Sequence, residues 1–554
     1  MCGLWEMVVE EDLEKHGSEE MVLAEAHQKS LKKTKKKSKR IILLSPPFRK
    51  IEYERYRLGE NLGIRYLASF LENIGYEVEV LDPSLSHFSI EKTAKIILKE
   101  DYDLIGFTIP NGGLFSNVVK VIRILRKNGF KGHITLGGHF PTFEHKEILR
   151  YNKNIDSIVQ HEGEITLFEL VNNLDKEENF KNILGLSYRN SKQICINPPR
   201  PLIKNLNDLP FPKRDKNLKY NQNNHYTMVT SRGCYGNCSF CSIRAFYDYD
   251  KPLWRYRSPN NVVDEIKYLI NNYNAKVISF MDDNFIGPGK FGKKRAIEIA
   301  NEIINRGISI YFEISCRPND IDEHILKVLK RAGLRHVSVG IESGNEDVLK
   351  RFNKKTTVLQ NINAIKTLRK TNLSFTPYFI MFDPWTTISE LKDNLRFLYN
   401  NNICTYRSIK NAITLYNGTP FYEQLKHNSG RVNWEYQYNF KNTDVAEVYF
   451  MIDSLSEFNK INPIIDILMY TQDLNNKGIR ETLKKIQTET NEFTYNTTMR
   501  IINWVTNDKS ENDHFAKDIR DDISSFTDQI KNLLFAKGLE QVLHELEFRN
   551  HDRK

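Results

Sequence analysis

Short apolar runs alternate with longer amphipathic segments through the first third of the chain. The run Ile41–Leu44 is continuously apolar and is closed by Ser45-Pro46-Pro47, as expected for a buried strand that ends in a turn. Further strand-like runs lie at 78–81, 104–108 and 133–136, and stretches with helical spacing separate them. Strands that alternate with helices predict right-handed crossovers, and therefore a Rossmann-like, doubly wound parallel sheet of the α/β class.

The same alternation returns after residue 220. Each strand-like run is again separated from the next by a helical stretch, and the runs lie at 228–231, 277–281, 310–315, 336–341, 375–382 and 409–415. Beyond residue 428 the chain is polar, aromatic and mostly helical, with helices expected at 458–470, 479–486 and 519–548. The pattern therefore predicts a second α/β domain followed by a helical one.

A chain of 554 residues is too long for a single hydrophobic core. The expected domains, in chain order, are a flexible charged extension (1–39), a Rossmann-like domain (40–175), a proline-rich linker with a short hairpin (176–219), the second α/β domain (220–428) and the helical C-terminal domain (429–554).

The net charge of +10 is concentrated, because seven basic residues fall between Lys32 and Arg40. A solvated tether is the favoured interpretation of this tract, contact with RNA or an anionic surface is the alternative, and no nucleic-acid partner is predicted. No apolar run approaches the ~18 residues that a membrane helix needs, and no signal peptide is recognisable. Four isolated cysteines do not resemble a secreted disulfide framework, so a cytoplasmic location is expected.

Three of the seven cysteines, Cys234, Cys238 and Cys241, lie within eight residues in the spacing C-x3-C-x2-C. Thiolates favour zinc or iron–sulfur centres. Structural zinc takes four ligands, normally in two pairs, and the sequence offers no second C-x2-C or H-x3-H pair. Three thiolates instead suit a cubane cluster with one open iron. The alternative is three small core residues without a metal.

This spacing, with Phe240 directly before the last cysteine, resembles the signature of the radical S-adenosylmethionine (SAM) superfamily. The resemblance implies a [4Fe–4S] cluster with Cys234, Cys238 and Cys241 as metal ligands and catalytic residues. It also implies a partial (β/α)6 barrel, SAM on the open iron, and an external electron donor of the flavodoxin or ferredoxin type. One-electron reduction would cleave SAM to a 5′-deoxyadenosyl radical.

Further residues at the expected strand ends match this family and are implied to bind cofactor together with Phe240. Asp282 and Asp283, in a D-D-x-F turn, would hold the SAM amino group, and a helix-capping pair is their alternative role. Glu342 and Ser343, in a G-I-E-S-G turn, would bind the ribose or another part of SAM. Arg317 would lie near the SAM carboxylate or cobalamin, and a surface ion pair is its alternative.

Two residues of this domain stand apart from that pattern. Cys316 is expected to be an inert interior thiol rather than a nucleophile. Where many relatives carry G-x-P-G-E-T, this chain has Phe382-Asp383-Pro384-Trp385-Thr386-Thr387, and the bulky Trp385 replaces a glycine. The substitution weakens any transfer of substrate identity from those relatives.

Residues 40–175 resemble the cobalamin-binding domain that precedes many radical SAM cores. Ligands of such sheets bind beyond the carboxyl ends of the strands, and the residues implied there are Ser45, Thr108, Asn111, Gly137, Gly138, His139, Thr142, Glu162 and Gly163. The D-x-H-x-x-G motif is absent, which implies base-off cobalamin without a histidine ligand. The alternatives are a domain that is empty or binds a nucleotide, although no G-x-G-x-x-G follows the first strand.

Together these resemblances imply a cobalamin-dependent radical SAM enzyme of the class B type. The favoured reaction is methylation of an unactivated carbon of a natural-product or peptide substrate, by way of a 5′-deoxyadenosyl radical and methylcobalamin. Cyclisation, ring contraction or oxidation without methyl transfer is an alternative within the same architecture. A non-catalytic iron–sulfur or zinc binding module is the alternative of another class. The C-terminal domain is expected to cap the barrel and help to bind a small-molecule or peptide substrate.

Overall fold

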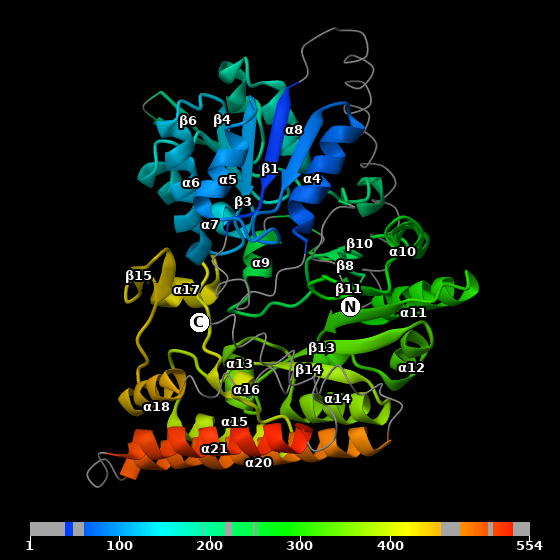
Figure 1. Ribbon diagram of the computed structural model, residues 1–554, viewed down its shortest axis with the longest axis vertical. Coiled ribbons are helices and arrows are strands. Elements are labelled where there is room, and N and C mark those ends of the chain that lie inside the picture. The colour runs from blue at the N-terminus through cyan, green and yellow to red at the C-terminus, as the bar shows by residue number, and fades with distance from the viewer. Residues whose placement is uncertain are drawn as a thin grey trace, which may run out of the picture.

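The structure is a computed structural model that describes residues 39–47, 60–191, 193–215, 224–247, 250–251, 253–455, 477–507 and 514–535. The helix expected at 458–470, the end of the helix expected at 519–548 and all but the last residue of the extension at 1–39 lie outside these residues. Two sheet domains lie one above the other, and a layer of long helices runs along the lower edge (Figure 1).

The first sheet has the strand order β2-β1-β3-β4-β5-β6-β7. Its first five strands are parallel, and the bounds of all seven are β1 (Arg40–Leu44), β2 (Glu77–Leu81), β3 (Leu104–Thr108), β4 (His133–Gly137), β5 (Ser157–Val159), β6 (Leu186–Asn190) and β7 (Gln193–Ile196). The helices of this domain are α4 (Leu62–Asn73), α5 (Ile90–Ile97), α6 (Phe115–Lys127), α7 (His139–Tyr151) and α8 (Glu164–Asn172). The predicted doubly wound sheet is thereby confirmed.

Both faces of this sheet are buried. Ile41 and Leu43 belong to a core with α4 and α8, whereas Ile42 and Leu44 belong to a second core with α5 and α6. Two covered faces leave only the ends of the strands for a ligand.

The hairpin β6–β7, which the sequence placed in the linker, is part of the first sheet. β6 pairs antiparallel with β5 and buries Leu186 and Tyr188. Without it the β5 edge would present unpaired backbone groups. The sheet therefore extends to Ile196, beyond the predicted boundary at residue 175.

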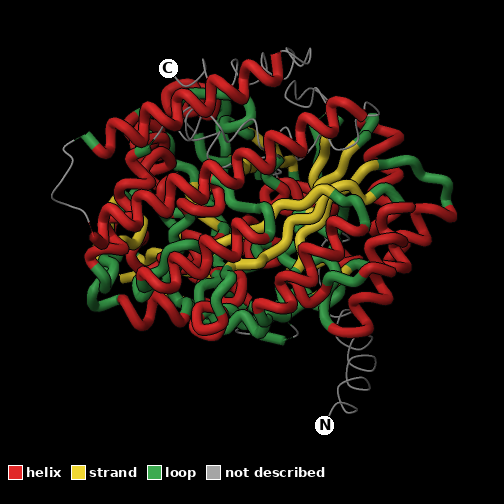
Figure 2. The backbone as a smooth tube through the Cα atoms, turned by 90° about the horizontal axis from the view of Figure 1, so that it is seen from below, coloured by secondary structure: helices red, strands yellow, loops and turns green. Residues whose placement is uncertain are grey.

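The second sheet has the order β14-β13-β12-β11-β8, and its five strands are parallel. Their bounds are β8 (His225–Met228), β11 (Val277–Phe280), β12 (Tyr311–Cys316), β13 (Leu334–Glu342) and β14 (Ser374–Phe379). The covering helices are α10 (Pro259–Tyr273), α11 (Gly289–Asn305), α12 (Glu323–Arg331), α14 (Val358–Lys370) and α15 (Ile388–Asn400). Figure 2, seen from below, shows yellow strands with red helices on either side of them.

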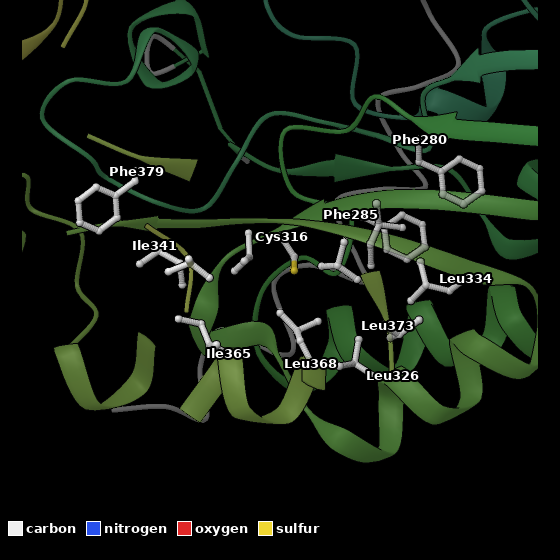
Figure 3. Close-up of a cluster of buried hydrophobic side chains, with 14 of the residues drawn as sticks. Phe280, Phe285, Cys316, Leu326, Leu334, Ile341, Ile365, Leu368, Leu373 and Phe379 are labelled. Atoms are coloured by element: carbon white, nitrogen blue, oxygen red, sulfur yellow. The ribbon is translucent and has the colours of Figure 1, made fainter. Parts of the chain in front are cut away.

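One apolar core lies between this sheet and its helices. Figure 3 shows Cys316 in that core, among side chains that include Ile341 and Leu368. Burial raises the pKa of the Cys316 thiol well above its ordinary value. Both observations support the interpretation of Cys316 as an inert interior residue.

Two strand predictions for this domain were inaccurate. The first strand begins and ends three residues before the predicted run at 228–231, because Thr230 and Ser231 turn away to bind Asp282. The strand expected at 409–415 is wrong: Thr405 caps a short helix, α16 (Tyr406–Lys410). A parallel bridge between Phe382 and Ala412 follows, and an antiparallel bridge joins Leu415 to Tyr436. The sixth position of the barrel is therefore marked by a single bridge.

The C-terminal helices α18 (Thr443–Ser454), α20 (Lys477–Asn507) and α21 (Phe515–Phe535) form the layer along the lower edge of Figure 1. Asn491 of α20 accepts a hydrogen bond from the Cys404 backbone (2.8 Å) and donates one to the Tyr399 carbonyl (3.1 Å). These long helices therefore support the outer helical layer beside α15. Among the described residues, no helix combines the length and apolar character that a membrane crossing requires.

Candidate active site

The three cysteines lie on a tight loop between β9 (Ser231–Arg232) and α9 (Ser242–Tyr247). Gly233 has φ +83°, and a Cβ there would lie 1.9 Å from the Leu253 carbonyl oxygen, so only glycine fits. The Gly236 N–H donates to Cys234 Sγ (3.3 Å), and the Cys241 N–H donates to the Cys238 carbonyl (3.2 Å). The loop backbone thus fixes where each sulfur lies.

Neighbouring segments hold this loop from the outside. Phe240 packs edge-on against Phe352, with ring centroids 5.3 Å apart, and the Ser239 N–H donates to the Phe352 carbonyl (2.9 Å). The Asn353 side chain donates to the Asn237 carbonyl (2.7 Å). In the structure Phe240 is an anchor of the loop, and its predicted contact with a cofactor stays a prediction.

The cysteine loop fits an iron–sulfur cluster. Burial raises the pKa of the Cys234 thiol, and burial together with the charge of Cys238 raises the pKa of Cys241 to about 12, so these sulfurs need bound iron to be thiolates at neutral pH. A cluster takes each cysteine on a separate iron. Across the described residues, no three His, Cys, Asp or Glu side chains converge as the ligands of one ion. Three cysteines on one loop therefore fit the cluster that their spacing predicts.

Arg317 lies directly against the cysteine loop. Its Nη1 donates to Cys238 Sγ (3.4 Å), and its Nη2 donates to the Lys354 carbonyl. The guanidinium also lies over the Tyr235 ring, 5.5 Å from the centroid. Arg317 is buried, so the alternative of a surface ion pair is wrong, and the side chain lies beside the cysteines rather than at the first sheet. Its predicted contact with SAM stays a prediction.

The two adjacent aspartates have different surroundings. Asp282 is buried and accepts hydrogen bonds from the Thr230 N–H and the Ser231 hydroxyl, both at 2.7 Å. Asp283 accepts one from the Gly233 N–H (3.0 Å) and is exposed.

Neither aspartate caps a helix, because the next helix, α11, has Pro288 at its N-cap. The helix-capping alternative is therefore wrong. Asp282 is committed to holding the end of β8, so Asp283 is the aspartate of the pair that is accessible to a SAM amino group. That contact remains a prediction.

Glu342 lies at a bulge of β13 in the left-handed region, with φ +62°. A non-glycine residue there carries strain, which is typical of functional sites. The Lys354 ammonium donates to its carboxylate (2.9 Å), and both side chains are buried. The Ser343 hydroxyl instead donates to Asn394 of α15 (2.8 Å). The structure thus commits Ser343 to holding its turn, and the predicted role of Glu342 toward SAM is untested.

The carboxyl edge of the first sheet carries most of the residues expected to bind cobalamin. Ser45 follows β1 and donates to Asp82, which follows β2. A Cβ at Gly138, which has φ +94°, would lie 2.8 Å from the Thr108 hydroxyl. Gly138 therefore keeps the turn after Gly137 close to the end of β3.

Two polar atoms at this edge fit a ligand that donates hydrogen bonds. Asp82 Oδ2 and Asn111 Oδ1 are buried and have no hydrogen-bond partner within the part of the chain that the structure describes. Leaving such atoms unpaired costs about 1–3 kcal/mol each. The amide groups on the rim of a corrin are donors of the required kind, so Asp82 and Asn111 would hold cobalamin here.

Three further residues expected to bind cobalamin contact neighbouring protein segments, and their role toward the cofactor stays a prediction. The His139 ring lies 4.3 Å from the ring of Phe246 in α9, the helix that follows the cysteines, and burial lowers the pKa of His139 to about 4. Thr142 accepts a hydrogen bond from the His161 N–H (2.9 Å). Gly163 packs tightly against Leu67. The carboxyl edge of the first sheet and α9, the helix that follows the cysteines, are therefore in direct contact.

Glu162 is fully engaged by the second domain. It accepts hydrogen bonds from Arg232, from Arg255 and from the Ile203 N–H, each at 2.8 Å, and Glu164 accepts one from Arg232 (2.6 Å). Although burial opposes ionisation, Arg255 and Arg232 hold the pKa of Glu162 below its usual range. Arg232 precedes Cys234 by two residues. Glu162 thus docks one domain on the other through Arg232 and Arg255, and the predicted contacts of Glu162 and Gly163 with cobalamin stay predictions.

A second buried network joins the same domains. Arg214 pairs with Glu60, next to α4, and with Glu265 of α10, and Arg257 also pairs with Glu265. These side chains are almost completely buried. Breaking a buried pair costs several kcal/mol, so the relative placement of the two sheets is strongly fixed.

Sequence reasoning missed a hairpin that covers the first sheet. β15 (Gly430–Val432) and β16 (Glu435–Gln437) present Trp434, which packs edge-on against Phe115 with centroids 4.7 Å apart. Arg431 and Tyr436 both donate to Glu144, at 2.8 and 2.7 Å. A Cβ at Gly112 would lie 2.1 Å from the Trp434 carbonyl oxygen. The available signal was the turn residue Asn433 between two short polar runs.

Sequence reasoning also missed a polar row on the inner face of the second sheet. The row crosses all five strands at one level and consists of Thr227, Ser279, Glu313, His336 and Ser374. The Ser279 hydroxyl donates to Glu313 (2.9 Å), and the next level holds Ser315, Ser338 and Thr376. Parallel sheets are normally apolar on both faces. The signal was the recurrence of polar residues at alternate positions, as with Glu313 and Ser315 in β12 and His336 and Ser338 in β13.

Family models match both domains of the chain: the radical SAM superfamily over residues 228–398 and the B12 binding domain over residues 54–171. An uncharacterized methyltransferase of Pyrococcus horikoshii is 31% identical over 449 residues, which are 80% of this chain and 91% of that protein. The anaerobic magnesium-protoporphyrin IX monomethyl ester cyclase of Cereibacter sphaeroides is 28% identical, over 61% of this chain and 56% of its own length.

Solved structures share the fold. The cobalamin-dependent SAM radical enzyme OxsB with aqua-cobalamin bound is 19% identical, with a TM-score of 0.72 over 93% of this chain and 84% of that one. The radical SAM methyltransferase TsrM from Kitasatospora setae, with cobalamin and a [4Fe–4S] cluster, is 17% identical, with a TM-score of 0.59 over 71% of this chain and 75% of that one.

The chain belongs to the cobalamin-binding radical SAM enzymes. Its cofactors are accordingly a [4Fe–4S] cluster, SAM and cobalamin. This result confirms the expected family and fold class, with the sixth barrel strand reduced as described above.

Proposed function

We propose that the enzyme methylates a carbon atom of a small polar substrate. The observation that carries this proposal is the direct contact between the edge of the first sheet and the helix that follows the cysteines, 4.3 Å between the His139 and Phe246 rings. When bound, cobalamin would supply a transferable methyl group, and the cluster with SAM would supply a radical that removes a hydrogen atom. Neighbouring sites allow both reactive groups to reach one substrate atom.

The residues of the chain would position and shield this reaction. Cys234, Cys238 and Cys241 would hold the cluster, and Asp283 and Glu342 would orient SAM. The polar row with Glu313 and Ser279 would bind hydroxyl or amine groups of the substrate, because the inner face offers hydrogen-bonding side chains where a core would offer apolar ones. The hairpin with Trp434 would close the outer side of the cobalamin edge against water.

Three further assignments belong to the proposal. An external donor of the flavodoxin or ferredoxin type would supply the electron. Within the described part of the tail beyond residue 428, the hairpin β15–β16 would be the element that reaches the substrate region, because α20 packs on the outer layer. A reducing, cytoplasmic location suits thiols that must remain free to bind iron.

A radical reaction without methyl transfer is the second candidate, favoured by the 28% identity to the magnesium-protoporphyrin cyclase. The two candidates differ in what happens to SAM. Methylation consumes SAM both as methyl donor and as radical source, and therefore forms S-adenosylhomocysteine and 5′-deoxyadenosine. The second reaction forms 5′-deoxyadenosine alone.

The test is an anaerobic assay of the full chain reconstituted with iron, sulfide and cobalamin, to which SAM and titanium(III) citrate are added. Both products are quantified by mass spectrometry, with Cys238→Ala as the control. We expect both products from the wild type and no 5′-deoxyadenosine from the control. 5′-Deoxyadenosine without S-adenosylhomocysteine would support the second candidate, and the absence of both would contradict the proposed function.

A further inference from the structure

Arg317 places a fixed positive charge against one of the cluster cysteines. It follows β12 directly, and each of its three nitrogens has a hydrogen-bond acceptor: Nη1 has Cys238 Sγ at 3.4 Å, Nη2 has the Lys354 carbonyl, and Nε has Asn319 Oδ1 at 3.4 Å. The Tyr235 ring covers the guanidinium from the cysteine loop. The side chain is therefore held in one orientation.

The backbone of the loop is shaped to admit this guanidinium. A Cβ at Gly236 would lie 2.4 Å from Arg317 Nη1 and 3.4 Å from Cys234 Sγ, so any larger residue would displace the arginine or the sulfur. Gly236 has an ordinary negative φ, and it is close approach rather than strain that requires glycine here.

The charge of Arg317 is directed at sulfur rather than at a carboxylate. Among the described residues, no Asp or Glu forms an ion pair with it, although it is only 6% exposed. The buried Asp320 carboxylate interacts with Arg317 electrostatically, and its own hydrogen bonds come from Tyr235 and Asn284. Thiolates that carry a cluster would add negative charge directly beside the guanidinium, because each iron-bound cysteine is deprotonated.

We propose that Arg317 is a positioning residue that raises the reduction potential of the cluster on Cys234, Cys238 and Cys241 through its hydrogen bond to Cys238 Sγ. Titanium(III) gives one electron to the oxidised cluster and becomes titanium(IV). The added negative charge is shared with the cysteine sulfurs, where the guanidinium stabilises it. Hydrogen bonds and net charge at the sulfurs are recognised determinants of cluster potential. The proposal rests on the cluster assignment and not on methyl transfer.

The test uses the full chain reconstituted with iron and sulfide, and compares Arg317→Met, Arg317→Lys and Arg351→Met with the wild type. Arg351 is the matched control, because it is a partly buried arginine near the loop that pairs with Asp383 and Glu390 and touches no cysteine. Iron content, midpoint potential from a titration followed by electron paramagnetic resonance, and SAM affinity from equilibrium dialysis are measured for each protein.

We expect Arg317→Met to lower the equilibrium constant for cluster reduction about tenfold, which is about 59 mV for a one-electron couple. The midpoint potential of Arg317→Lys should lie between those of Arg317→Met and the wild type, because lysine keeps the charge and loses the fixed hydrogen bond. The midpoint potential of Arg351→Met should equal that of the wild type. 5′-Deoxyadenosine formation by Arg317→Met should fall with dithionite and recover with the stronger reductant titanium(III) citrate, which a structural defect would not do.

An unchanged potential in Arg317→Met would overturn the proposal, as would an equal decrease in Arg351→Met. An unchanged potential with weakened SAM binding would assign Arg317 to SAM instead. If Arg317→Met takes up no iron, the midpoint potentials of Arg317→Lys and Arg317→Gln are compared with that of the wild type. Two unchanged potentials would reject the proposed role. A lower potential in Arg317→Gln would support it. None of these results depends on whether a methyl group is transferred.

Discussion

The two parallel sheets of this enzyme are built alike and used differently. In β1 of the first sheet, alternate residues enter two separate apolar cores, Ile41 on one face and Ile42 on the other. In β11 of the second sheet, Ile278 and Phe280 enter a core, whereas Ser279 between them is half-buried and belongs to the polar row on the other face. The first sheet can bind a ligand only at its edge, and the second can also bind one on its inner face.

This difference separates the region suited to a large cofactor from the region suited to a polar ligand. The edge of the first sheet presents unpaired polar atoms of Asp82 and Asn111 beside glycine turns, which suits a large flat cofactor. The inner face of the second sheet presents small hydroxyl groups with Glu313, which suits a polar substrate. Arg232 and Arg255 join the two regions through Glu162. A rigid junction can thus combine two cofactor sites without a moving domain.

The largest expected effect on stability comes from introducing an aspartate into the first sheet, and the same change in the second sheet is the comparison. Ile42→Asp buries a carboxylate in an apolar core and should lower the free energy of unfolding by about 4 kcal/mol. Ser338→Asp, on the half-buried inner face, should cost less than about 1.5 kcal/mol. Urea unfolding followed by circular dichroism measures both. Equal losses would show that the inner face is as closed as the core.

The junction should be the next most sensitive region. Arg255→Met leaves Glu162 buried with one of its two guanidiniums and should lower the free energy of unfolding by about 3 kcal/mol. The surface change Arg396→Met, which breaks a pair with Asp393, should cost less than about 0.5 kcal/mol. Denaturant midpoints compare the two variants, and a small effect of Arg255→Met would mean that the domains are not coupled through this pair.

Acid should weaken the first sheet. Burial lowers the pKa of His133 to about 4, below its ordinary value of 6.5. Between these values the unfolded chain binds a proton that the folded chain does not, so stability is present above pH 6.5 and is lost as the pH falls toward 4. His133 alone accounts for up to about 3 kcal/mol of this loss. His133→Asn should flatten the dependence of urea midpoints on pH between 7 and 4.5, and an unaltered slope would contradict the assignment.

The smallest effect on stability should come from the polar row itself. Glu313 accepts one hydrogen bond from Ser279 and is half-buried, so Glu313→Gln should change the free energy of unfolding by less than about 0.5 kcal/mol. Glu265→Gln is the matched control, because Glu265 is fully buried between Arg214 and Arg257 and its change should cost about 3 kcal/mol. Similar losses would indicate that Glu313 supports the fold rather than a ligand.

The alternation of strands and helices was enough to predict both sheets, because buried strands are recognisable from local apolar runs. The strand expected at 409–415 failed for a local reason: Thr405 forms a capping box with Ser408 and begins a helix inside an apolar stretch. The hairpin β6–β7 was recognised but assigned to the linker rather than to the first sheet, because strand pairing depends on a distant edge, that of β5, which no local pattern reveals.

The cysteines could be predicted because their spacing is local, whereas the partners of other site residues could not. Glu162 was expected to bind cobalamin, but its partners Arg232 and Arg255 lie 70 and 93 positions away. The contact between Arg317 and Cys238 spans 79 positions. Residue type indicated that these groups were charged and belonged near a site, and only the fold could decide which charges face each other.

The docking pairs at Glu162 also bear on the order in which the enzyme is made. The last strand of the first sheet ends at Ile196, and Arg255 follows 59 residues later. At ribosomal rates of about 5–20 residues per second, that interval lasts about 3–12 s. During this time the nascent first domain can fold while its carboxyl edge is still uncovered by the hairpin β15–β16, which is synthesised later. Protein synthesis thus provides a period in which a bulky ligand has free access to an edge that the finished chain encloses.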